Sequence, residues 1–313
     1  MSLVVSLTGW DPEPWVEAFG DLLPDHEVLT PAQVTAPDDV HYVATWKHPP
    51  GSLSAYKNLR AIFSLGAGVD HVFRDADLPN VPVVRVVDAD LRDRMSEWVM
   101  LHVLMHHRQQ RMYDWQQGAR IWEDDRFQPA ARDVRVGVMG MGVLGADAAR
   151  KLAVIGFDVA GWSRTPKEVD GVESYAEDEL DEFLGRTDIL VVLLPLTPAT
   201  RGILNASLFG RLARDGRLGA PVLLNAGRGG LQNEADILEA LNEGVLKAAT
   251  LDVFETEPLP QDSPLWDDPR ITITPHNAAI SEVDSIARFV AGKIAALDRG
   301  ENLTDVVDPQ RQY

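Results

Sequence analysis

The sequence predicts an α/β fold of two domains, each built on a parallel β-sheet. Three observations support this prediction. Short apolar segments typical of strands alternate with segments of helical periodicity through most of the 313 residues. A glycine-rich turn joins one such strand to one such helix between residues 134 and 155. Four later strand-like segments end in polar residues, as expected where parallel strands direct their carboxyl ends to one ligand site.

The N-terminal part is predicted to hold strands at residues 3–7, 28–29, 41–45, 59–65 and 83–87, with a helix at 15–22. Two loops follow the carboxyl ends of these strands, where ligands of open α/β sheets collect. The first loop begins with Trp46 and Lys47. The second loop is Gly66-Ala67-Gly68-Val69-Asp70, and its successive N–H groups can form an anion site. A plain tight turn is the alternative interpretation of the second loop.

A long helix is predicted over residues 90–111, and its position suggests that it links the two domains. Apolar residues spaced for burial support it: Met95, Val99, Leu101, Val103 and Leu104. His102 and His106 lie four residues apart, a spacing that can hold a metal, but no further ligand is evident and packing histidines are favoured. We therefore predict no metal site. The predicted domains are residues 1–98 with 280–313, and residues 99–279.

A glycine fingerprint follows the strand predicted over residues 134–139. Gly140, Gly142 and Gly145 form G-x-G-x-x-G directly before a helix predicted over residues 146–155. The first glycine permits the turn, the second lets a pyrophosphate approach the backbone, and the third lets helix and strand pack closely. The N-terminus of such a helix, here with Val143 and Leu144, offers N–H groups to phosphates. Because both flanks fit, dinucleotide binding is favoured over an incidental glycine turn.

The segment after the next predicted strand, residues 159–162, indicates which dinucleotide binds. An acidic residue normally contacts the ribose hydroxyls of NAD there, but none lies between Asp158 and Glu168. The chain has Ser163, Arg164 and Thr165 instead, and a guanidinium can pair with a phosphate while the hydroxyls donate to it. NADP(H) is therefore the expected cofactor, with NAD second. The alternative is that Arg164 is only a solvated loop arginine.

Polar residues follow the strands predicted over residues 189–194, 221–225, 248–252 and 271–274. They are Thr197, Arg228, Asp252 with Glu257, and His276. Each of these residue types has a role in reducing a 2-oxo acid. Arg228 can hold the substrate's carboxylate and carbonyl, and His276 can donate a proton to the carbonyl oxygen.

Two carboxylates complete this predicted constellation. Glu257 can hydrogen-bond the far imidazole nitrogen of His276 and favour its protonated form. Asp252 can accept from the nicotinamide carboxamide. A single arginine or aspartate at a strand end is often only a cap or a loop ion pair, but four such strand ends together favour an active site.

Composition narrows the classes of partner and the location. The net charge is −19, from 48 acidic and 29 basic residues, which argues against nucleic acid and anionic membranes. Only six of the basic residues are lysine, and an acidic, lysine-poor surface resembles that of proteins from salt-loving organisms. The alternative is an ordinary acidic enzyme. Equal stability of the protein in dilute buffer and in molar salt would contradict the halophile hypothesis. The absence of cysteine excludes disulfides and thiolate chemistry. With no signal peptide or membrane-length apolar run, we expect a cytoplasmic protein.

These motifs together resemble the D-2-hydroxyacid dehydrogenase family. The resemblance runs from Gly137 to Ala279 through the glycine fingerprint, Leu194-Pro-Leu-Thr-Pro198, Thr200-Arg-Gly, Asn225-x-x-Arg-Gly229, Leu251-Asp-Val-Phe254, Glu257-Pro-Leu-Pro260, Ser263-Pro-Leu-Trp266 and Thr274-Pro-His276. It implies Rossmann-like or flavodoxin-like domains with parallel sheets, an active site in the interdomain cleft, and a homodimer formed through the cofactor-domain face and the long helix.

The same resemblance implies roles for individual residues. Arg228, Glu257 and His276 match the family's catalytic set, and the amides of Ala67 and Gly68 match its substrate-carboxylate loop. The remaining strand-end residues of these motifs are assigned to cofactor binding: Leu194, Pro195, Thr200, Ala226, Gly227 and Asp252.

Within the family, residues 162–165 and 48–50 are most similar to the NADPH-dependent glyoxylate/hydroxypyruvate reductase A subgroup, which places Trp46 in the substrate pocket although Lys47 intervenes. Asn277 and Asn233 depart from the usual pattern, and Asn277 leaves the substrate preference open. The lysine-poor acidic surface is not typical of the bacterial glyoxylate enzymes, so larger 2-oxo acids also stay open as substrates. The alternatives are an NADP-dependent dehydrogenase of formate or phosphite, and a dinucleotide-sensing corepressor-like protein. No disordered tail or docking segment of such a corepressor is evident in the sequence.

Overall fold

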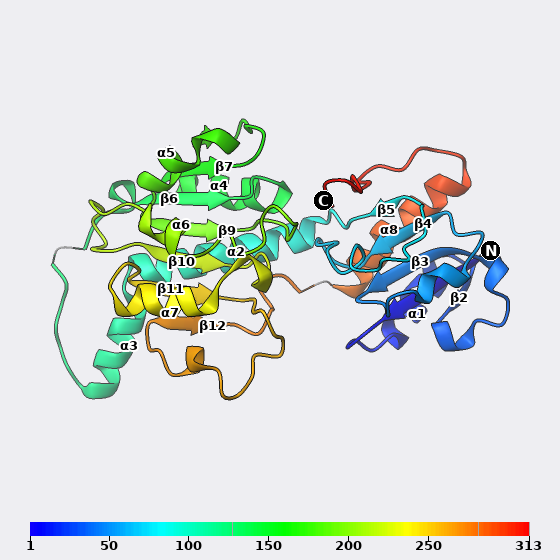
Figure 1. Ribbon diagram of the computed structural model, residues 1–313, viewed down its shortest axis with the longest axis horizontal. Helices are drawn as coiled ribbons and strands as arrows, with labels where there is room; N and C mark the ends of the chain where they lie inside the picture. The colour runs from blue at the N-terminus through cyan, green and yellow to red at the C-terminus, as the bar shows by residue number, and fades with distance from the viewer. Residues whose placement is uncertain (127, 281, 313) are drawn as a thin grey trace. The chain divides into compact units, whose positions relative to one another are not determined.

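The computed structural model describes residues 1–126, 128–280 and 282–312, and the chain divides into two compact units (Figure 1). Unit 1 comprises Met1–Leu91 with Ile280–Tyr313, and unit 2 comprises Arg92–Ala279. The sequence places the first boundary between residues 98 and 99, whereas the units divide between residues 91 and 92. This division lies inside helix α2 (Ala89–His107), so one helix begins in unit 1 and continues in unit 2.

Unit 1 is built on one parallel five-stranded sheet. Its strands are β1 (Ser2–Leu7), β2 (Glu27–Leu29), β3 (Val40–Trp46), β4 (Ala61–Ser64) and β5 (Val83–Val84). They lie in the order β2-β1-β3-β4-β5, the flavodoxin-like order. In this register Leu7 pairs with Trp46 and Thr45 pairs with Ser64, so the loops after β1, β3 and β4 leave the same edge.

Helices cover one face of this sheet, and loops cover the other. Helix α1 (Glu13–Leu22) and helix α8 (Val283–Asp298) pack together and bury Phe19 and Ile294 against strand residues such as Phe63 (Figure 1). Leu53 and Val72, from the irregular segments, close the opposite face. Helix α8 is the last helix of the described residues.

Unit 2 is built on a parallel seven-stranded sheet. Its strands are β6 (Arg135–Met139), β7 (Asp158–Trp162), β8 (Val172–Tyr175), β9 (Ile189–Val192), β10 (Val222–Asn225), β11 (Ala248–Leu251) and β12 (Ile271–Ile273). The order β12-β11-β10-β9-β6-β7-β8 is that of a doubly wound, dinucleotide-binding sheet, and it reverses between β6 and β9. The predicted α/β class with two parallel sheets is confirmed.

Helices cover both faces of this second sheet. Helix α2 and helix α4 (Val143–Ile155) lie on one face, and α5 (Leu180–Gly185), α6 (Ala206–Gly210) and α7 (Glu234–Asn242) lie on the other. Strands β9 and β10 are buried along their whole length, because helices cover both of their sides. Strand β8 and helices α5, α6 and α7 are not among the elements expected from the sequence.

The prediction of a single helix over residues 90–111 is wrong. Helix α2 ends at His107, and Gln109 adopts a left-handed backbone with φ 55°, from which α3 (Gln110–Ala119) starts in a new direction. The prediction that Leu101 is buried is also wrong, because that side chain is 55% exposed. Among the described residues, no helix combines the length and the apolar character needed to cross a bilayer.

Candidate active site

The glycine turn after β6 has the geometry that its sequence requires. Gly140 has φ 103°, a left-handed conformation that favours glycine, and its N–H donates to the carbonyl of Trp162. A Cβ on Gly145 would lie 1.9 Å from the carbonyl oxygen of Gly140, so only glycine lets helix α4 start this close to the strand. The first and third positions of the fingerprint are therefore glycines for steric reasons internal to the protein.

The second glycine has a different surrounding. A Cβ built on Gly142 would meet nothing within 4 Å. Gly142 is the N-cap of α4, no side chain caps that end, and the adjacent Val143 is 44% exposed. The N-terminal amides of α4 thus face open space, the arrangement that a pyrophosphate needs. These residues fit a dinucleotide.

The segment after β7 places the predicted phosphate-binding residues at the same edge of the sheet. Ser163 donates its N–H to the carbonyl of Tyr175, and its hydroxyl donates to the carbonyl of Thr165 over 2.7 Å. These bonds form a tight loop in which Arg164 and Thr165 are exposed. An exposed guanidinium on an ordered loop can reach a phosphate ester without disturbing the fold.

The segment after β9 is closed by threonines. The hydroxyl of Thr200 donates to the carbonyl of Pro195 over 2.7 Å and accepts from the N–H of Thr197 over 2.9 Å. Leu194 is buried, and its carbonyl oxygen would lie 2.7 Å from a Cβ on Gly227. The segments after β9 and β10 therefore touch through their backbones, and Ala226 lies beside this contact with 7% exposure.

The turn that carries Arg228 is shaped by Asn225, a fully buried residue whose function the sequence does not predict. The Asn225 side chain accepts from the N–H of Gly227 over 3.0 Å and donates to the carbonyl of Arg228 and to Gln232. A Cβ on Gly229 would lie 1.9 Å from the carbonyl oxygen of Phe254, so the turn rests directly on the segment after β11. The asparagine of the Asn-x-x-Arg-Gly motif was the available signal for this role.

His276 and Glu257 form the hydrogen bond that the sequence predicts. The distance between His276 Nδ1 and Glu257 Oε2 is 2.8 Å, and the side chains are 35% and 24% exposed. The other carboxylate oxygen of Glu257 accepts from the N–H of Phe254 over 3.2 Å, which orients the carboxylate. With Nδ1 bound to the carboxylate, Nε2 of His276 is the ring nitrogen left to face a substrate.

Asp252 is 1% exposed and holds the segment after β12 in place. One carboxylate oxygen accepts from the Thr274 hydroxyl over 2.6 Å and from the Asn277 N–H, and the other accepts from the Ala278 N–H. The carbonyl of Asp252 accepts from the His276 N–H over 2.8 Å. The structure therefore shows Asp252 orienting the histidine segment, while its predicted contact with a nicotinamide carboxamide stays a prediction.

Helix α2 contributes a residue to this arrangement that the sequence did not single out. The indole N–H of Trp98 donates to the Thr274 hydroxyl over 3.2 Å, which in turn donates to Asp252. His106 bonds the Thr250 hydroxyl over 2.8 Å, and burial lowers its pKa to about 3. His102 packs on the Trp98 ring at 4.4 Å. The two helix histidines thus have separate partners, and no cluster of three or more metal-ligating side chains occurs in the described part of the chain.

In unit 1 the loops after β3 and β4 pack against each other. A Cβ on Gly66 would lie 2.6 Å from the Trp46 ring, so the tryptophan packs directly against the predicted carboxylate turn. Trp46 also stacks on Trp10, with ring centroids 5.0 Å apart and planes 10° apart. Ala67 and Gly68 are partly exposed at the tip of the turn. The predicted substrate residues of unit 1 are therefore together at one edge of its sheet.

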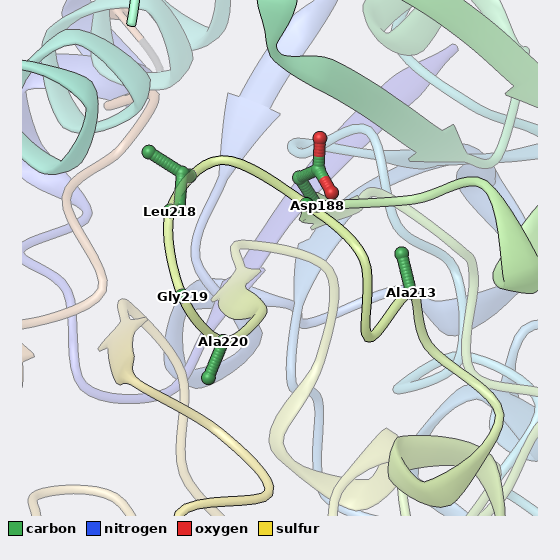
Figure 2. A pocket seen from close by; sticks show the side chains of 6 residues that line it. Asp188, Ala213, Leu218, Gly219 and Ala220 are labelled. Carbon is green, nitrogen blue, oxygen red and sulfur yellow. The ribbon is translucent and has the colours of Figure 1, made fainter. Parts of the chain in front are cut away.

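A small hollow in unit 2 lies elsewhere. It lies at the amino ends of β9 and β10 (Figure 2) and is lined by Asp188, Ala213, Gly216, Leu218, Gly219 and Ala220. Asp188 there accepts two hydrogen bonds from the Arg135 guanidinium, the shorter being 2.8 Å. This ion pair closes the amino edge of the sheet, opposite the edge that carries the predicted site, so the hollow is not a candidate for it.

Comparison with known proteins identifies the family. Residues 100–278 match the family described as D-isomer specific 2-hydroxyacid dehydrogenase, NAD binding domain. The chain belongs to this family. Its members are NAD(P)-dependent oxidoreductases acting on 2-hydroxy acids, and unit 2 contains the NAD-binding domain.

Relatives of this dehydrogenase carry more specific names. The chain is 40% identical over 287 residues to a glyoxylate/hydroxypyruvate reductase A of Yersinia enterocolitica, covering 89% of each chain. A crystal structure of an NADPH-dependent glyoxylate/hydroxypyruvate reductase from Sinorhizobium meliloti, with NADP and sulfate, is 50% identical, with a TM-score of 0.94 and coverage of 100% and 99%. A probable 2-hydroxyacid dehydrogenase from Rhizobium etli, solved with NADP, is 46% identical, also with a TM-score of 0.94 and the same coverage.

The His276–Glu257 hydrogen bond predicts a pH effect. The carboxylate accepts a hydrogen bond from the ring and stabilises the positive charge of the protonated imidazole, so Glu257→Gln should remove this stabilisation from the proton donor. Reduction requires the protonated ring, so in the variant the reductive rate should fall at a lower pH than in the wild type. The measurement is kcat/KM for 2-oxo acid reduction between pH 5 and 9, with Glu255→Gln, a neighbouring exposed carboxylate, as control. An unchanged pH profile for Glu257→Gln would rule out this function of the pair.

Proposed function

We propose that this dehydrogenase reduces 2-oxo acids to D-2-hydroxy acids and prefers NADPH as the hydride donor. The single observation that carries the proposal is the hydrogen bond between His276, on the segment after β12, and Glu257, on the segment after β11. Strand β11 lies between β12 and β10, the strand that precedes the Arg228 turn. The pair and the Arg228 turn lie at the carboxyl edge where the glycine turn of β6 also ends. A proton donor and a carboxylate-binding arginine beside a dinucleotide site are the groups that carbonyl reduction needs.

In the proposed mechanism the substrate carboxylate is held by the amides of Ala67 and Gly68 and by the Arg228 guanidinium. A nicotinamide bound at the glycine turn would supply the hydride for the carbonyl carbon. His276 donates its Nε2 proton to the carbonyl oxygen, so the product is the neutral hydroxyl. Glu257 stabilises the imidazolium before the transfer, and Asp252 keeps the histidine segment in position. Trp46, which lies against the turn, bounds the substrate side chain.

The preference for NADPH rests on the loop after β7. Ser163, Arg164 and Thr165 replace the acidic residue that contacts the ribose of NAD, and the loop is exposed at the carboxyl edge. The structural relatives from Sinorhizobium meliloti and Rhizobium etli were solved with NADP. The names of the relatives from Sinorhizobium meliloti and Yersinia enterocolitica make glyoxylate and hydroxypyruvate the first substrates to test. We further propose that the enzyme acts in the cytoplasm. The chain has no cysteine, so its fold does not depend on disulfide bonds and is compatible with a reducing compartment.

The experiment that tests the proposal is a steady-state assay with NADPH and NADH. The panel is glyoxylate, hydroxypyruvate, pyruvate and branched 2-oxo acids, with formate and phosphite tested in the oxidative direction. We expect NADPH-dependent turnover of 2-oxo acids, and a rate lower by about 10² or more in His276→Gln because the general acid is lost. Absence of turnover with every 2-oxo acid, or wild-type rates in His276→Gln, would refute it.

The cofactor loop generates a separate prediction. Arg164→Ala should raise KM for NADPH by about tenfold or more while leaving KM for NADH nearly unchanged, because a charge-assisted contact to the 2′-phosphate is lost. Lys167→Ala is the matched control, since it removes an exposed cation three residues away in the same loop. Equal increases in both KM values for Arg164→Ala would mean that the guanidinium does not contact the phosphate.

We propose in addition that the enzyme is a homodimer. The surface of α2, α3 and the following residues exposes a concentration of large apolar side chains: Leu101 at 55%, Trp115 at 66%, Ile121 at 42% and Trp122 at 102%. An exposed apolar group of this size marks an interaction surface in a soluble protein. A second copy of the chain is the occupant that fits best, because this surface includes the long helix at which the family resemblance places the dimer interface.

The dimer proposal predicts the effect of removing two tryptophans. Trp115→Ser combined with Trp122→Ser should weaken self-association by about tenfold or more, because buried tryptophans contribute most of the binding energy in such interfaces. Trp266→Ser, at another exposed tryptophan of unit 2 (51%), is the matched control. Light scattering after size exclusion gives the mass of each variant. A monomeric wild type, or a double variant as dimeric as the wild type, would refute the assignment.

A further inference from the structure

The predicted carboxylate turn of unit 1 is held from below by one buried hydroxyl. Ser64 is 0% exposed, and its Oγ lies 3.0 Å from the carbonyl oxygen of Gly66 and 2.9 Å from that of Gly68. The same oxygen accepts from the N–H of Gly66 over 3.4 Å. One buried side chain thus contacts the backbone of the turn at three points.

These contacts fix the direction of an amide. The carbonyl of Gly66 and the N–H of Ala67 belong to one trans peptide plane, in which the two groups point in opposite directions. Because Ser64 binds the carbonyl on the buried side, the Ala67 N–H is directed away from the interior. The Ala67 N–H is one of the two groups proposed to receive the substrate carboxylate.

His71 lies behind Ser64 and determines which way its proton points. His71 is 6% exposed, and its Nε2 lies 3.1 Å from Ser64 Oγ. Its Nδ1 accepts the backbone N–H of Lys47 over 3.1 Å. A backbone N–H can only donate, so Nδ1 carries no proton, and the proton of the neutral ring is on Nε2. Nε2 therefore donates to Ser64, which leaves the serine proton for the glycine carbonyls.

The same histidine also holds the other loop of the predicted substrate site. Lys47, whose N–H it accepts, has φ 53°, a conformation that costs energy for a residue with a side chain and persists only where its surroundings impose it. The His71 ring packs on the Trp46 ring with centroids 4.6 Å apart. One imidazole thus connects Trp46, Lys47 and the glycine turn through one continuous chain of hydrogen bonds and ring contacts.

We propose that His71, acting through Ser64, is the positioning residue that directs the Ala67 amide toward the substrate carboxylate. His71 also sets the distance between the Ala67 amide and Trp46. His71 itself does not touch the substrate. The inference rests on the proposed function for the identity of the ligand, a 2-oxo acid carboxylate. It goes beyond that function by naming the two buried residues, His71 and Ser64, that orient the carboxylate-binding amide of unit 1.

Three substitutions test the chain of contacts. Ser64→Ala removes the clamp, and His71→Leu removes both hydrogen bonds of the ring. His71→Gln keeps a donor near the position of Nε2 and should restore part of the affinity. We expect Ser64→Ala and His71→Leu to raise KM for the 2-oxo acid by about tenfold, with His71→Gln in between and KM for NADPH unchanged. His26→Gln is the matched control, because His26 is another histidine of unit 1, with 7% side-chain exposure and paired with Asp298.

A binding measurement separates this inference from the proposed function. Oxamate, an unreactive 2-oxo acid analogue, is titrated against tryptophan fluorescence in each protein. Wild type that binds oxamate without any turnover refutes the proposed reaction only, and the variants then still test His71 through oxamate affinity. The inference is overturned if folded Ser64→Ala binds oxamate with wild-type affinity, or if it loses as much affinity for NADPH as for oxamate. It is also overturned if the wild type binds no oxamate. If His71→Leu fails to fold, Ser64→Ala decides alone.

Discussion

The parallel register of the unit 2 sheet is the constraint on which the predicted active site depends. Hydrogen bonding between β6, β9, β10, β11 and β12 brings their carboxyl ends level, so loops far apart in the chain leave one edge. This is why Arg228 and His276, separated by nearly fifty residues, lie at the same edge of the sheet, on loops whose strands are separated only by β11. The helices on both faces keep the strands buried, and only the strand ends remain free to carry chemistry.

Buried polar groups then turn these strand ends into defined geometry. Asp252 and Asn225 in unit 2, and Ser64 in unit 1, are almost fully buried and spend their hydrogen bonds on the backbone of the loops beside them. Such groups are costly to bury unless they are satisfied, so each tolerates only a narrow range of loop conformations. In both units, therefore, the residues predicted to bind the substrate are at least partly exposed, and the residues that fix the position of their loops are buried.

Close backbone contacts complete this rigidity. Gly145 against Gly140, and Gly229 against Phe254, leave no room for a side chain, so the helix start and the Arg228 turn cannot shift without steric conflict. Gly142 is the exception, since no atom of the described residues lies within 4 Å of a Cβ built there. The sequence motif alone does not distinguish a glycine required by the protein's own packing from one that leaves room for a ligand. The tertiary structure makes this distinction.

The sequence by itself determined the α/β class, the glycine turn and the order of the strand-end residues. These depend on local backbone preference and on the alternation of strands and helices, which are written in neighbouring residues. It did not predict the break at Gln109 or the exposed Leu101, because helical periodicity continues through both positions while the tertiary surroundings do not.

Only the tertiary structure decided what Asp252, Trp98 and His71 bind. The hydrogen-bond partners of Asp252 and Trp98, and the Lys47 N–H that His71 accepts, lie more than twenty residues away in the sequence. The donor and acceptor nitrogens of His71 depend on the groups that the fold places beside its ring. A local sequence pattern encodes neither of these facts.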